Sequence, residues 1–480
     1  MTISRTVLLA SVAALVVAAA PASAETLRDA LAKAYRSNPT LTGARAGQRA
    51  NDENVPIQKA SGRPGVTSQA QFQNLLVKPA NSFFAPDRSV EGSASLDVPI
   101  YSGGAVRNSV KAAKIRVEAG QADLRATESS VFSQVVAAYM DVIRDSAIVA
   151  LNRANVNVLE VNLQATNDRF EVGDLTRTDI AQSESRLALA RSDLQSAEAN
   201  LITSRENYIA LVGEAPDDLE TPPELPGLPA TPDAAVQVAL ADNPDIFSAQ
   251  KARQAAGVDV KVAKAGTLPT LSAFTQASYT HYLGSEGVGS APWTKQVVAG
   301  ATVALPLYQG GRPAAQVRQS QARESQAIET SVQVERNVIA QTRAAYASWQ
   351  ASLQTIQSSQ KAVDAASLSL EGVRAENTVG SRTILDILNA EQEALSARVQ
   401  LVSARRNAYV AGFSLLAAMG HAQADDLSLD GGALYDPTTN YDRVKGKWFD
   451  WDYDKAPMPV ATRTVDTHAQ TANVSPTAAQ

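Results

Sequence analysis

The 480-residue sequence contains no cysteine. This absence excludes disulfides, cysteine-ligated zinc, iron–sulfur clusters, thiol catalysis and a lipid-anchored cysteine. The three histidines, His281, His421 and His468, lie too far apart in sequence to form a local metal motif. Lysine and arginine number 43 against 49 aspartate and glutamate, and this mild acidity gives no reason to expect a nucleic-acid partner. We therefore expect no cofactor, no bound metal and no nucleic acid.

Long apolar runs are also missing after the first 24 residues. At the start, Arg5 precedes an uncharged stretch over residues 7–20, and Ala22-Ser23-Ala24 has the small residues of a cleavage site. The stretch would span only ~21 Å as a helix, short of a bilayer core of ~30 Å. We interpret residues 1–24 as a signal peptide rather than a membrane anchor, with the mature chain starting at Glu25. A mature chain that enters a membrane must then do so with strands.

The mature sequence contains an internal duplication with a period of 207 residues. Pro99-Ile-Tyr-Ser-Gly-Gly104 recurs as Pro306-Leu-Tyr-Gln-Gly-Gly311. The same offset relates further pairs of motifs: Ala137-Ala-Tyr139 and Ala344-Ala-Tyr346, Val172-Gly173 and Val379-Gly380, and Gly213 and Gly420. This period is far longer than that of a solenoid repeat, so the pattern indicates a duplicated half.

Each half contains a pair of predicted strands, at about residues 66–101 and 270–308. Residues 89–100 and 295–307 alternate between apolar or small and polar side chains, which predicts one apolar and one polar face. Residues 78–82 and 284–289 have the glycine, proline and asparagine of hairpin loops. Strands of this length match those that cross a bilayer at a tilt, and a soluble β-sandwich is the alternative.

Long helices are predicted after each strand pair. No proline occurs between Pro99 and Pro216 or between Pro313 and Pro437, and apolar residues recur at steps of seven in both stretches. Sustained heptads predict left-handed supercoiling. The first helix would run from about residue 104 to 170, or ~100 Å. Gly173 and Gly380 end these runs, so each half is predicted to hold a helical hairpin whose tip is that glycine.

Four strands per chain cannot close a sheet in a membrane, where an open edge is not tolerated. Three copies would supply twelve strands. The glycine pairs Gly103-Gly104 and Gly310-Gly311 lie where strand gives way to helix, and we expect a chain bend at each. No GxGxxG spacing accompanies them, so they are not a dinucleotide fingerprint.

The duplicated layout and three motifs resemble the TolC-type outer-membrane efflux protein family. The motifs are Leu305-Pro-Leu-Tyr-Gln-Gly-Gly311, Arg169-Phe-Glu-Val-Gly173 and Val379-Gly-Ser-Arg-Thr-Ile-Leu-Asp386. The resemblance implies a mixed α/β membrane protein: a homotrimer with a 12-stranded transmembrane β-barrel, four strands per chain, continuous with a long α-helical coiled-coil periplasmic tunnel. It implies a place in the outer membrane of a Gram-negative bacterium, in contact with its lipid, with most of the chain in the periplasm. It also implies a periplasmic adaptor and an inner-membrane pump of RND or ABC type as partners, and drugs, toxins or unfolded proteins as cargo.

The resemblance further implies a gate at the periplasmic hairpin tips. Thr178, Asp179, Arg382 and Asp386 stand at the family's gate positions. Arg382 would bond Thr178 and neighbouring groups across helices, and Asp386 from three chains would form an anionic ring in which each carboxylate raises the pKa of the others.

Two gate positions depart from the family pattern. Asn377 stands where the family often has a tyrosine, which puts the link to Asp179 in doubt, and Asn389 replaces a frequent second aspartate. The alternative for Asp179 and Asp386 is a capping box with Thr176 and Thr383.

The predicted organisation has four parts after the signal peptide. Residues 25–213 form the first repeat and residues 236–420 the second, joined by a linker over 214–235 that we place in a collar. The repeated Asn-Pro at residues 38 and 243 is expected to end a short first helix of each half. Residues 421–480 would add a collar segment and a disordered tail, in which Trp448-Phe-Asp-Trp-Asp-Tyr-Asp454 is an aromatic–acidic patch that could instead bind a partner.

Two other classes of function compete with an exit duct. A hydrolytic enzyme needs a nucleophile–base set, and no GxSxG, HExxH or SxxK motif with its partners is evident, so we expect no enzymatic activity. An exported trimeric coiled-coil stalk or adhesin accounts for the heptads and for the export signal. It does not need two strand pairs at matched positions of a duplication.

Overall fold

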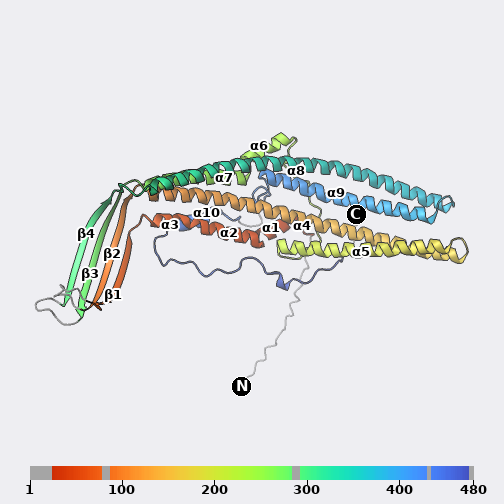
Figure 1. Cartoon of the computed structure of the whole chain (residues 1–480). Coiled ribbons are helices and arrows are strands. Elements are labelled where there is room, and N and C mark those ends of the chain that lie inside the picture. The colour runs from red at the N-terminus through yellow and green to blue at the C-terminus, as the bar shows by residue number, and fades with distance from the viewer. Residues whose placement is uncertain (1–23, 78–86, 284–291, 430–433, 475–480) are drawn as a thin grey trace, which may run out of the picture.

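The computed structural model of the chain describes residues 24–77, 87–283, 292–429 and 434–474. The expected signal peptide, apart from residue 24, and both expected hairpin loops lie outside the described residues. A four-stranded sheet occupies one end of an elongated molecule, and two long helical hairpins extend to the other end (Figure 1).

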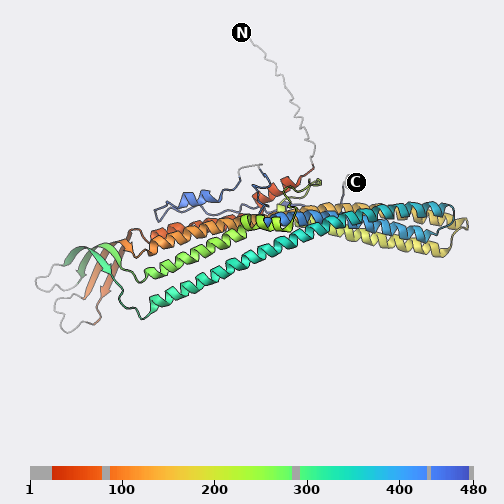
Figure 2. The ribbon, with the colours of Figure 1, turned by 90° about the horizontal axis from the view of Figure 1, so that it is seen from above.

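Four long helices come in two matched pairs. The helices α4 (Ala105–Glu171) and α8 (Arg312–Thr378) have 67 residues each, and α5 (Arg177–Val212) and α9 (Ile384–Met419) have 36 each. Both boundaries of α8 and of α9 fall 207 residues after those of α4 and α5, in agreement with the sequence repeat. Both hairpins end at the same side of the molecule (Figure 2). Within the described residues, no helix combines the length and apolar character needed to cross a bilayer.

Short helices precede each strand pair. They are α1 (Leu27–Ser37), α2 (Pro39–Asp52) and α3 (Asn54–Ala60) in the first half, and α6 (Pro232–Asp242) and α7 (Pro244–Ala265) in the second. The predicted role of the Asn-Pro motif is confirmed, because Asn38 ends α1 and Asn243 ends α6. Each asparagine also caps the helix that follows it. The Nδ2 of Asn38 donates to the carbonyl of Leu211, and the Nδ2 of Asn243 donates to the carbonyl of Ala418, both at 2.9 Å. The duplicated motif thus ties each short-helix corner to the end of a long helix.

The strands β1 (Gly65–Asn74), β2 (Arg88–Ser102), β3 (Thr270–Leu283) and β4 (Trp293–Ala304) form one antiparallel sheet in the order β1-β2-β3-β4. The fourth strand stops three residues before the predicted end, because Pro306 has no backbone N–H to donate to a neighbouring strand. The first strand likewise ends before residue 78. The edges β1 and β4 are exposed along their whole length in the single chain.

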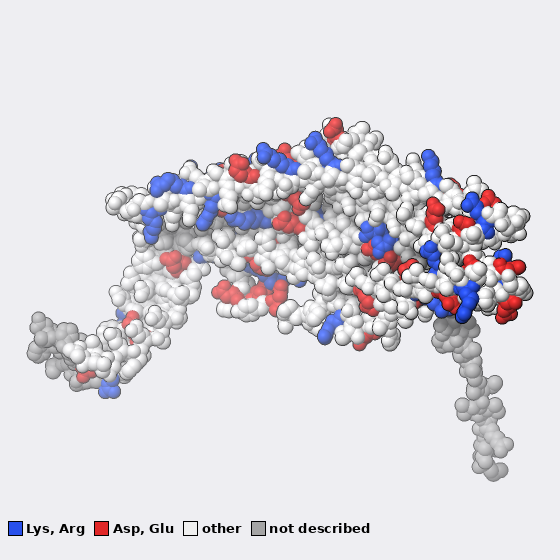
Figure 3. Space-filling view, turned by 45° about the vertical axis from the view of Figure 1, so that its right-hand side comes forward, with Lys and Arg blue, Asp and Glu red and all other residues white. Residues whose placement is uncertain are grey.

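The strand register gives this sheet one apolar and one polar face. Directly opposed residues share a face, so Val66, Leu96 and the alternating positions around them align across all four strands. The aligned apolar set is Val66, Phe72, Val90, Leu96, Val98, Leu271, Ala273, Ala277, Val297, Ala301 and Val303. On the face shown in Figure 3, the sheet carries few charged side chains, whereas the helical part carries many of both signs.

Aromatic side chains lie at both ends of the apolar face. Phe72, Tyr279 and Trp293 lie toward the loop end, and Tyr101 opposes Leu271 at the helix end. Eight residues of β3 separate Leu271 from Tyr279, or about 26 Å at ~3.3 Å per residue. That spacing is close to the ~25 Å apolar band, bounded by aromatic girdles, of membrane-spanning sheets.

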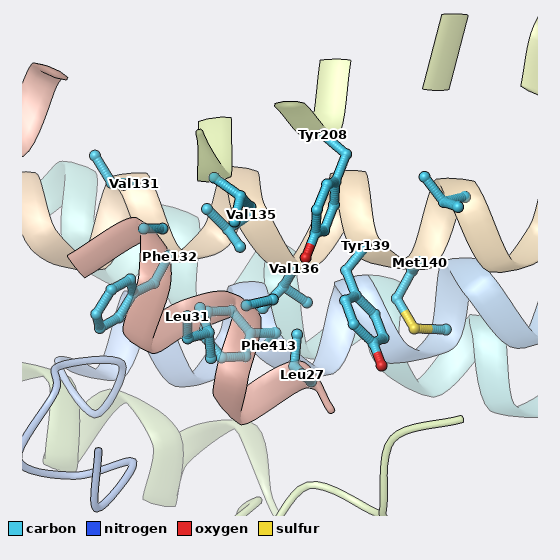
Figure 4. Close-up of a cluster of buried hydrophobic side chains, with 14 of the residues drawn as sticks. Leu27, Leu31, Val131, Phe132, Val135, Val136, Tyr139, Met140, Tyr208 and Phe413 are labelled. Atoms are coloured by element: carbon cyan, nitrogen blue, oxygen red, sulfur yellow. The ribbon is translucent and has the colours of Figure 1, made fainter. Parts of the chain in front are cut away.

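The main core lies at mid-length, where α1 packs on α4, α5 and α9 (Figure 4). Tyr139 of α4 is fully buried, and its hydroxyl donates to the carbonyl oxygens of Glu25 at 2.8 Å and Glu220 at 2.6 Å. Tyr346, the repeat counterpart on α8, donates to the carbonyl of Ala230 at 2.8 Å. The repeated tyrosine therefore fastens the start and the end of the 214–235 linker to the two long helices.

The chain after the second repeat differs from the disordered tail expected from the sequence. Residues 434–474 include α10 (Pro437–Val444) and the short 3₁₀ helix Thr464–Asp466. The backbone N–H of Tyr435 donates to the Tyr35 hydroxyl at 2.9 Å, and Arg205 donates to the carbonyl of Asn473 at 2.8 Å. Composition rich in proline, threonine and alanine did not reveal these contacts, because they use backbone groups of the tail and side chains of the body.

Candidate functional site

The first hairpin tip joins α4 to α5. Gly173 has φ of 87°, a left-handed conformation that glycine adopts without a steric cost. Thr176 and Asp179 then form a capping box, in which the Asp179 Oδ2 accepts from the Thr176 backbone N–H at 2.8 Å and from its hydroxyl at 2.7 Å. These hydrogen bonds to Thr176 lower the pKa of Asp179 below its ordinary value.

The second tip repeats this construction between α8 and α9. Gly380 has φ of 78°, and the Asp386 Oδ2 accepts from the N–H and hydroxyl of Thr383 at 2.9 Å and 2.7 Å. The hydrogen bond from the Thr383 hydroxyl is the main cause of a lowered pKa for Asp386. The capping interpretation is therefore present in both tips, and it leaves one oxygen of each carboxylate available to solvent or ions.

Arg382 makes a different contact from the one the resemblance implies. Its Nε lies 2.7 Å from Oε2 of Glu376 in the same hairpin, and this ion pair raises the pKa of Arg382. Asn377 donates from Nδ2 to the Arg382 carbonyl at 2.8 Å, so these two predicted residues are brought together. Among the described residues of this single chain, no hydrogen bond joins Arg382 to Thr178, which lies exposed at the start of α5.

Asn389 connects the two hairpins of the chain. Its Oδ1 accepts from Nη2 of Arg186 on α5 at 2.7 Å. A neutral amide at this position thus accepts one hydrogen bond from a cation of the other hairpin. The gate roles of Thr178, Asp179, Arg382 and Asp386 remain predictions. The two residues that depart from the family pattern, Asn377 and Asn389, both make hydrogen bonds in the tip region.

A buried carboxylate that the sequence analysis did not single out lies two residues after Asn389 on α9. Glu391 is only 6% exposed. Both of its carboxylate oxygens accept from Nδ2 of Asn162 on α4 at 3.1 Å, and Arg374 on α8 donates to Oε1 at 3.0 Å. One side chain therefore joins three long helices. Its position in a stripe with Leu388 and Ala394, both buried, was the available signal.

A cavity of about 240 Å³ adjoins this carboxylate. Its lining is mixed, with Leu159 and Leu388 as apolar walls and Arg186, Asp193 and Glu391 as charged groups. Among the residues described here, no group of three histidine, cysteine, aspartate or glutamate side chains is arranged to hold a metal ion. The residues that line this cavity suit polar contacts between helices, and no nucleophile–base pair is among them.

The glycine pairs at the other end position the sheet on the helices. Gly103 and Gly104 precede α4 with φ of 62° and 84°, and Gly310 and Gly311 precede α8 with φ of 62° and 79°. At Gly103, a Cβ atom would lie 2.9 Å from the carbonyl oxygen of Ala265. Both the backbone angles and this close approach require glycine, since a side chain would be strained there.

Comparison with known proteins decides the family. The sequence pattern of the family described as outer membrane efflux protein matches residues 30–214 and residues 235–421, one match in each half. The chain belongs to this family. The family, the outer-membrane location and the mixed α/β channel fold with four strands per chain, all predicted from the sequence, are thereby confirmed.

Individual relatives agree with this assignment. Over 431 residues the chain is 35% identical to the outer membrane efflux protein BepC of Brucella suis biovar 1 (strain 1330), covering 89% of this chain and 92% of BepC. It is 28% identical to the outer membrane protein TolC of Escherichia coli (strain K12) over 336 residues, covering 66% and 67% of the two chains. The Campylobacter jejuni CmeC outer membrane channel shares the fold with a TM-score of 0.73 at 17% identity, covering 88% of this chain and 89% of that one.

Proposed function

We propose that this outer membrane efflux family protein is the exit duct of a tripartite efflux or type I secretion system. In this role a homotrimer spans the outer membrane and the periplasm, and an adaptor and an inner-membrane pump deliver small molecules or unfolded proteins to the hairpin tips. The protein would act in transport and not as an enzyme. Opening and closing would occur at the tips, where Thr178, Asp179, Arg382 and Asp386 lie.

The observation that carries the proposal is the open sheet. The apolar face demands a lipid or protein cover, and β1 and β4 leave two unpaired edges in the single chain. Backbone N–H and C=O groups cannot remain unpaired in hydrocarbon. Pairing of β1 with β4 of the next copy removes both edges at once, and three copies give twelve strands around a lumen lined by the polar face.

The long helices supply the second part of the duct. Helices of 67 residues extend ~100 Å from the sheet, which is far more than one folded domain needs. In the single chain α4 is largely covered by other helices, whereas α8 is largely exposed and has only four buried residues. Neighbouring copies packed side by side would bury the exposed surface of α8 and continue the lumen to the hairpin tips.

Paired cysteines test the assembly, because the natural chain has none. One cysteine in β1 (Ala70→Cys) is combined in turn with one in β4 at residue 297, 299 or 301, and the membrane-inserted protein is treated with a short bifunctional thiol reagent. We expect covalent dimers and trimers, since the two edges of one sheet cannot reach each other. Ala94→Cys with Ala277→Cys is the matched control, because these residues are direct partners within one chain and should yield only cross-linked monomer.

Transport itself is tested by single-channel current in a planar bilayer. The purified trimer should give a small, stable and cation-selective conductance, and Arg382→Ser should enlarge it by releasing the Glu376 ion pair at the tip. A correctly inserted trimer that carries no current, even with Arg382→Ser, contradicts the duct and favours the stalk.

A further inference from the structure

The segment that follows α10 exposes four aromatic side chains within six residues. Trp448, Phe449, Trp451 and Tyr453 are 58%, 70%, 77% and 83% exposed. Single apolar side chains on a surface need no explanation, but a contiguous aromatic cluster marks an interaction site. We call residues 448–453 the aromatic segment.

The aromatic segment is fastened to the end of α3. The guanidinium carbon of Arg63 lies 4.3 Å from the centroid of the Trp448 ring, and Arg63 donates from Nη1 to the Lys447 carbonyl at 2.7 Å. Lys59 donates to the Lys445 carbonyl, also at 2.7 Å. Figure 2 shows α10 on the side of α3 away from α7 and α8. The segment is therefore held at a defined place outside the row of helices.

That place is level with the helix end of the sheet. Arg63 lies two residues before β1, whose first residue Gly65 opposes Asp97 of β2. Four residues later β2 reaches Tyr101, the aromatic that bounds the apolar face on this side. The aromatic segment thus lies at the level of one of the two girdles, and not at the hairpin tips or at the mid-length core.

Asp452 of the segment and Asp454 just after it are paired within the chain, whereas Asp450 of the segment is exposed. Asp452 pairs with Lys447 at 3.1 Å, and Asp454 pairs with Arg443 at 2.7 Å. These ion pairs neutralise two of the three carboxylates, so the outward chemistry is four aromatic rings and one exposed carboxylate, that of Asp450. One exposed carboxylate offers a basic partner protein less to bind than the three aspartates of the sequence would suggest.

Basic side chains surround the same place. Burial and the neighbouring charges of Lys114, Arg63 and Lys445 lower the pKa of Lys59. A cluster of cations beside exposed tryptophan and tyrosine suits the boundary of a bilayer, where aromatic rings settle among headgroups and cations meet lipid phosphates.

We propose that the aromatic segment is a membrane-interface anchor that inserts into the glycerophospholipid leaflet at the helix end of the sheet. The proposal rests on the proposed function, since it requires the sheet to span the membrane. Trp448, Phe449, Trp451 and Tyr453 extend the girdle at Tyr101 outward from the sheet, and the cations around Lys59 meet the phosphates. The tail thereby fixes the depth at which the helical body meets the bilayer.

The four tryptophans of the chain make the test direct. In a tail reporter, Trp293→Phe and Trp349→Phe leave Trp448 and Trp451 as the only emitters. In a sheet reporter, Trp349→Phe, Trp448→Phe and Trp451→Phe leave Trp293. Both full-length proteins are reconstituted into phosphatidylethanolamine–phosphatidylglycerol vesicles with a nitroxide label on a fraction of the headgroups or along the acyl chains.

The expected result is a shift of the tail reporter to shorter wavelength on reconstitution, with strong quenching by the headgroup label. Quenching of the sheet reporter without quenching of the tail reporter overturns the anchor and leaves the proposed function intact. Quenching of neither reporter overturns both. The anchor is also overturned if the tail reporter already emits at short wavelength in detergent-solubilised trimer and is not quenched by either lipid label in vesicles. A second copy of the chain would then cover the segment.

A paired substitution adds a second readout. Phe449→Ser with Tyr453→Ser in the tail reporter should reduce the quenching by the headgroup label. The matched control is Val460→Ser with Val465→Ser, which removes two side chains of the same tail that are 71% and 73% exposed. Equal quenching in all three proteins contradicts insertion of the aromatic rings.

Discussion

Asn162 on α4 donates from Nδ2 to both carboxylate oxygens of Glu391 on α9 at 3.1 Å. This contact joins the first hairpin of the chain to the second, and Arg374 adds α8 to the same carboxylate. A hairpin that swings away from the other must break it. Since Glu391 is buried, water cannot replace the lost partners until the helices have separated.

We predict that Glu391→Gln enlarges the single-channel conductance. The amide keeps the size of the side chain, but it loses the charge that holds Arg374 and presents an N–H₂ group toward a donor. Hydrogen bonds to a charged group contribute roughly 1.5–3 kcal/mol each. The loss of that stabilisation favours separated hairpins, and planar-bilayer current measures the result.

Glu393→Gln is the matched control for this substitution. It makes the same chemical change two residues along α9, at an exposed position. Its conductance should equal that of the natural protein. If Glu391→Gln conducts like Glu393→Gln, the contact with Asn162 stabilises the helices without restraining their opening.

The sequence predicted the architecture closely because its signals are local and repeated. Proline-free heptads predict the long helices, and alternation of apolar and polar residues predicts the strands. The repeat of these patterns in the second half makes the two predictions agree with each other. The helix ends at Glu171 and Thr378 followed from the glycines at 173 and 380, since a left-handed residue past a helix end is a local requirement.

The contacts of the candidate site were less accessible to sequence analysis. Glu391 is charged and reads as a surface residue, and its partner Asn162 lies 229 positions earlier in the chain. Arg382 and Glu376 are six residues apart across a turn, a spacing that no helix rule pairs. The tail contacts join backbone carbonyls to Arg205 and Arg63, and composition carries no information about such bonds.

We predict that charge and capping at Asp386 can be separated. Asp386→Asn removes the negative charge and keeps a side-chain oxygen for the capping contacts, so it should lower the cation selectivity of the channel several-fold while the helical signal is retained. Thr383→Val removes the hydroxyl that Asp386 accepts from and keeps the charge, so selectivity at neutral pH should persist. Reversal potentials in a salt gradient measure both variants.

Asp179→Asn serves as the comparison for Asp386→Asn. It makes the same change in the matching capping box of the first hairpin. Equal loss of selectivity in both variants would show that the two carboxylates share the ion path. Full selectivity in Asp386→Asn would reduce Asp386 to a helix cap.

We predict that Tyr139→Phe lowers the stability of the mid-length core. The substitution removes the hydroxyl that donates to the carbonyls of Glu25 and Glu220, and a buried polar group left unpaired costs about 1–3 kcal/mol. The helical circular-dichroism signal during heating should report a lower unfolding temperature. Tyr346→Phe is the control, because the Ala230 carbonyl is solvent-accessible and water can replace the lost donor. Equal effects of the two substitutions would contradict a special role for the buried tyrosine.

The last prediction concerns the pH dependence of cation selectivity. Hydrogen bonds from Thr383 lower the pKa of Asp386 below the ordinary value of 3.8. A carboxyl with a lowered pKa in the folded protein keeps its charge and its hydrogen bonds above that value, and it loses both only as pH falls through the lowered pKa. Cation selectivity should therefore persist to lower pH in the natural protein than in a variant that lacks the Thr383 hydroxyl.

Thr383→Val removes the main cause of the lowered pKa and should move the midpoint of selectivity loss to higher pH. In the proposed trimer, repulsion among three Asp386 carboxylates on the axis would act in the opposite direction in both proteins, so the difference between their midpoints isolates the effect of the hydroxyl. Reversal potentials recorded at successive pH values give the two midpoints. Coincident midpoints would show that the Thr383 hydroxyl does not govern the charge of Asp386, and that the group which sets ion selectivity lies elsewhere in the duct.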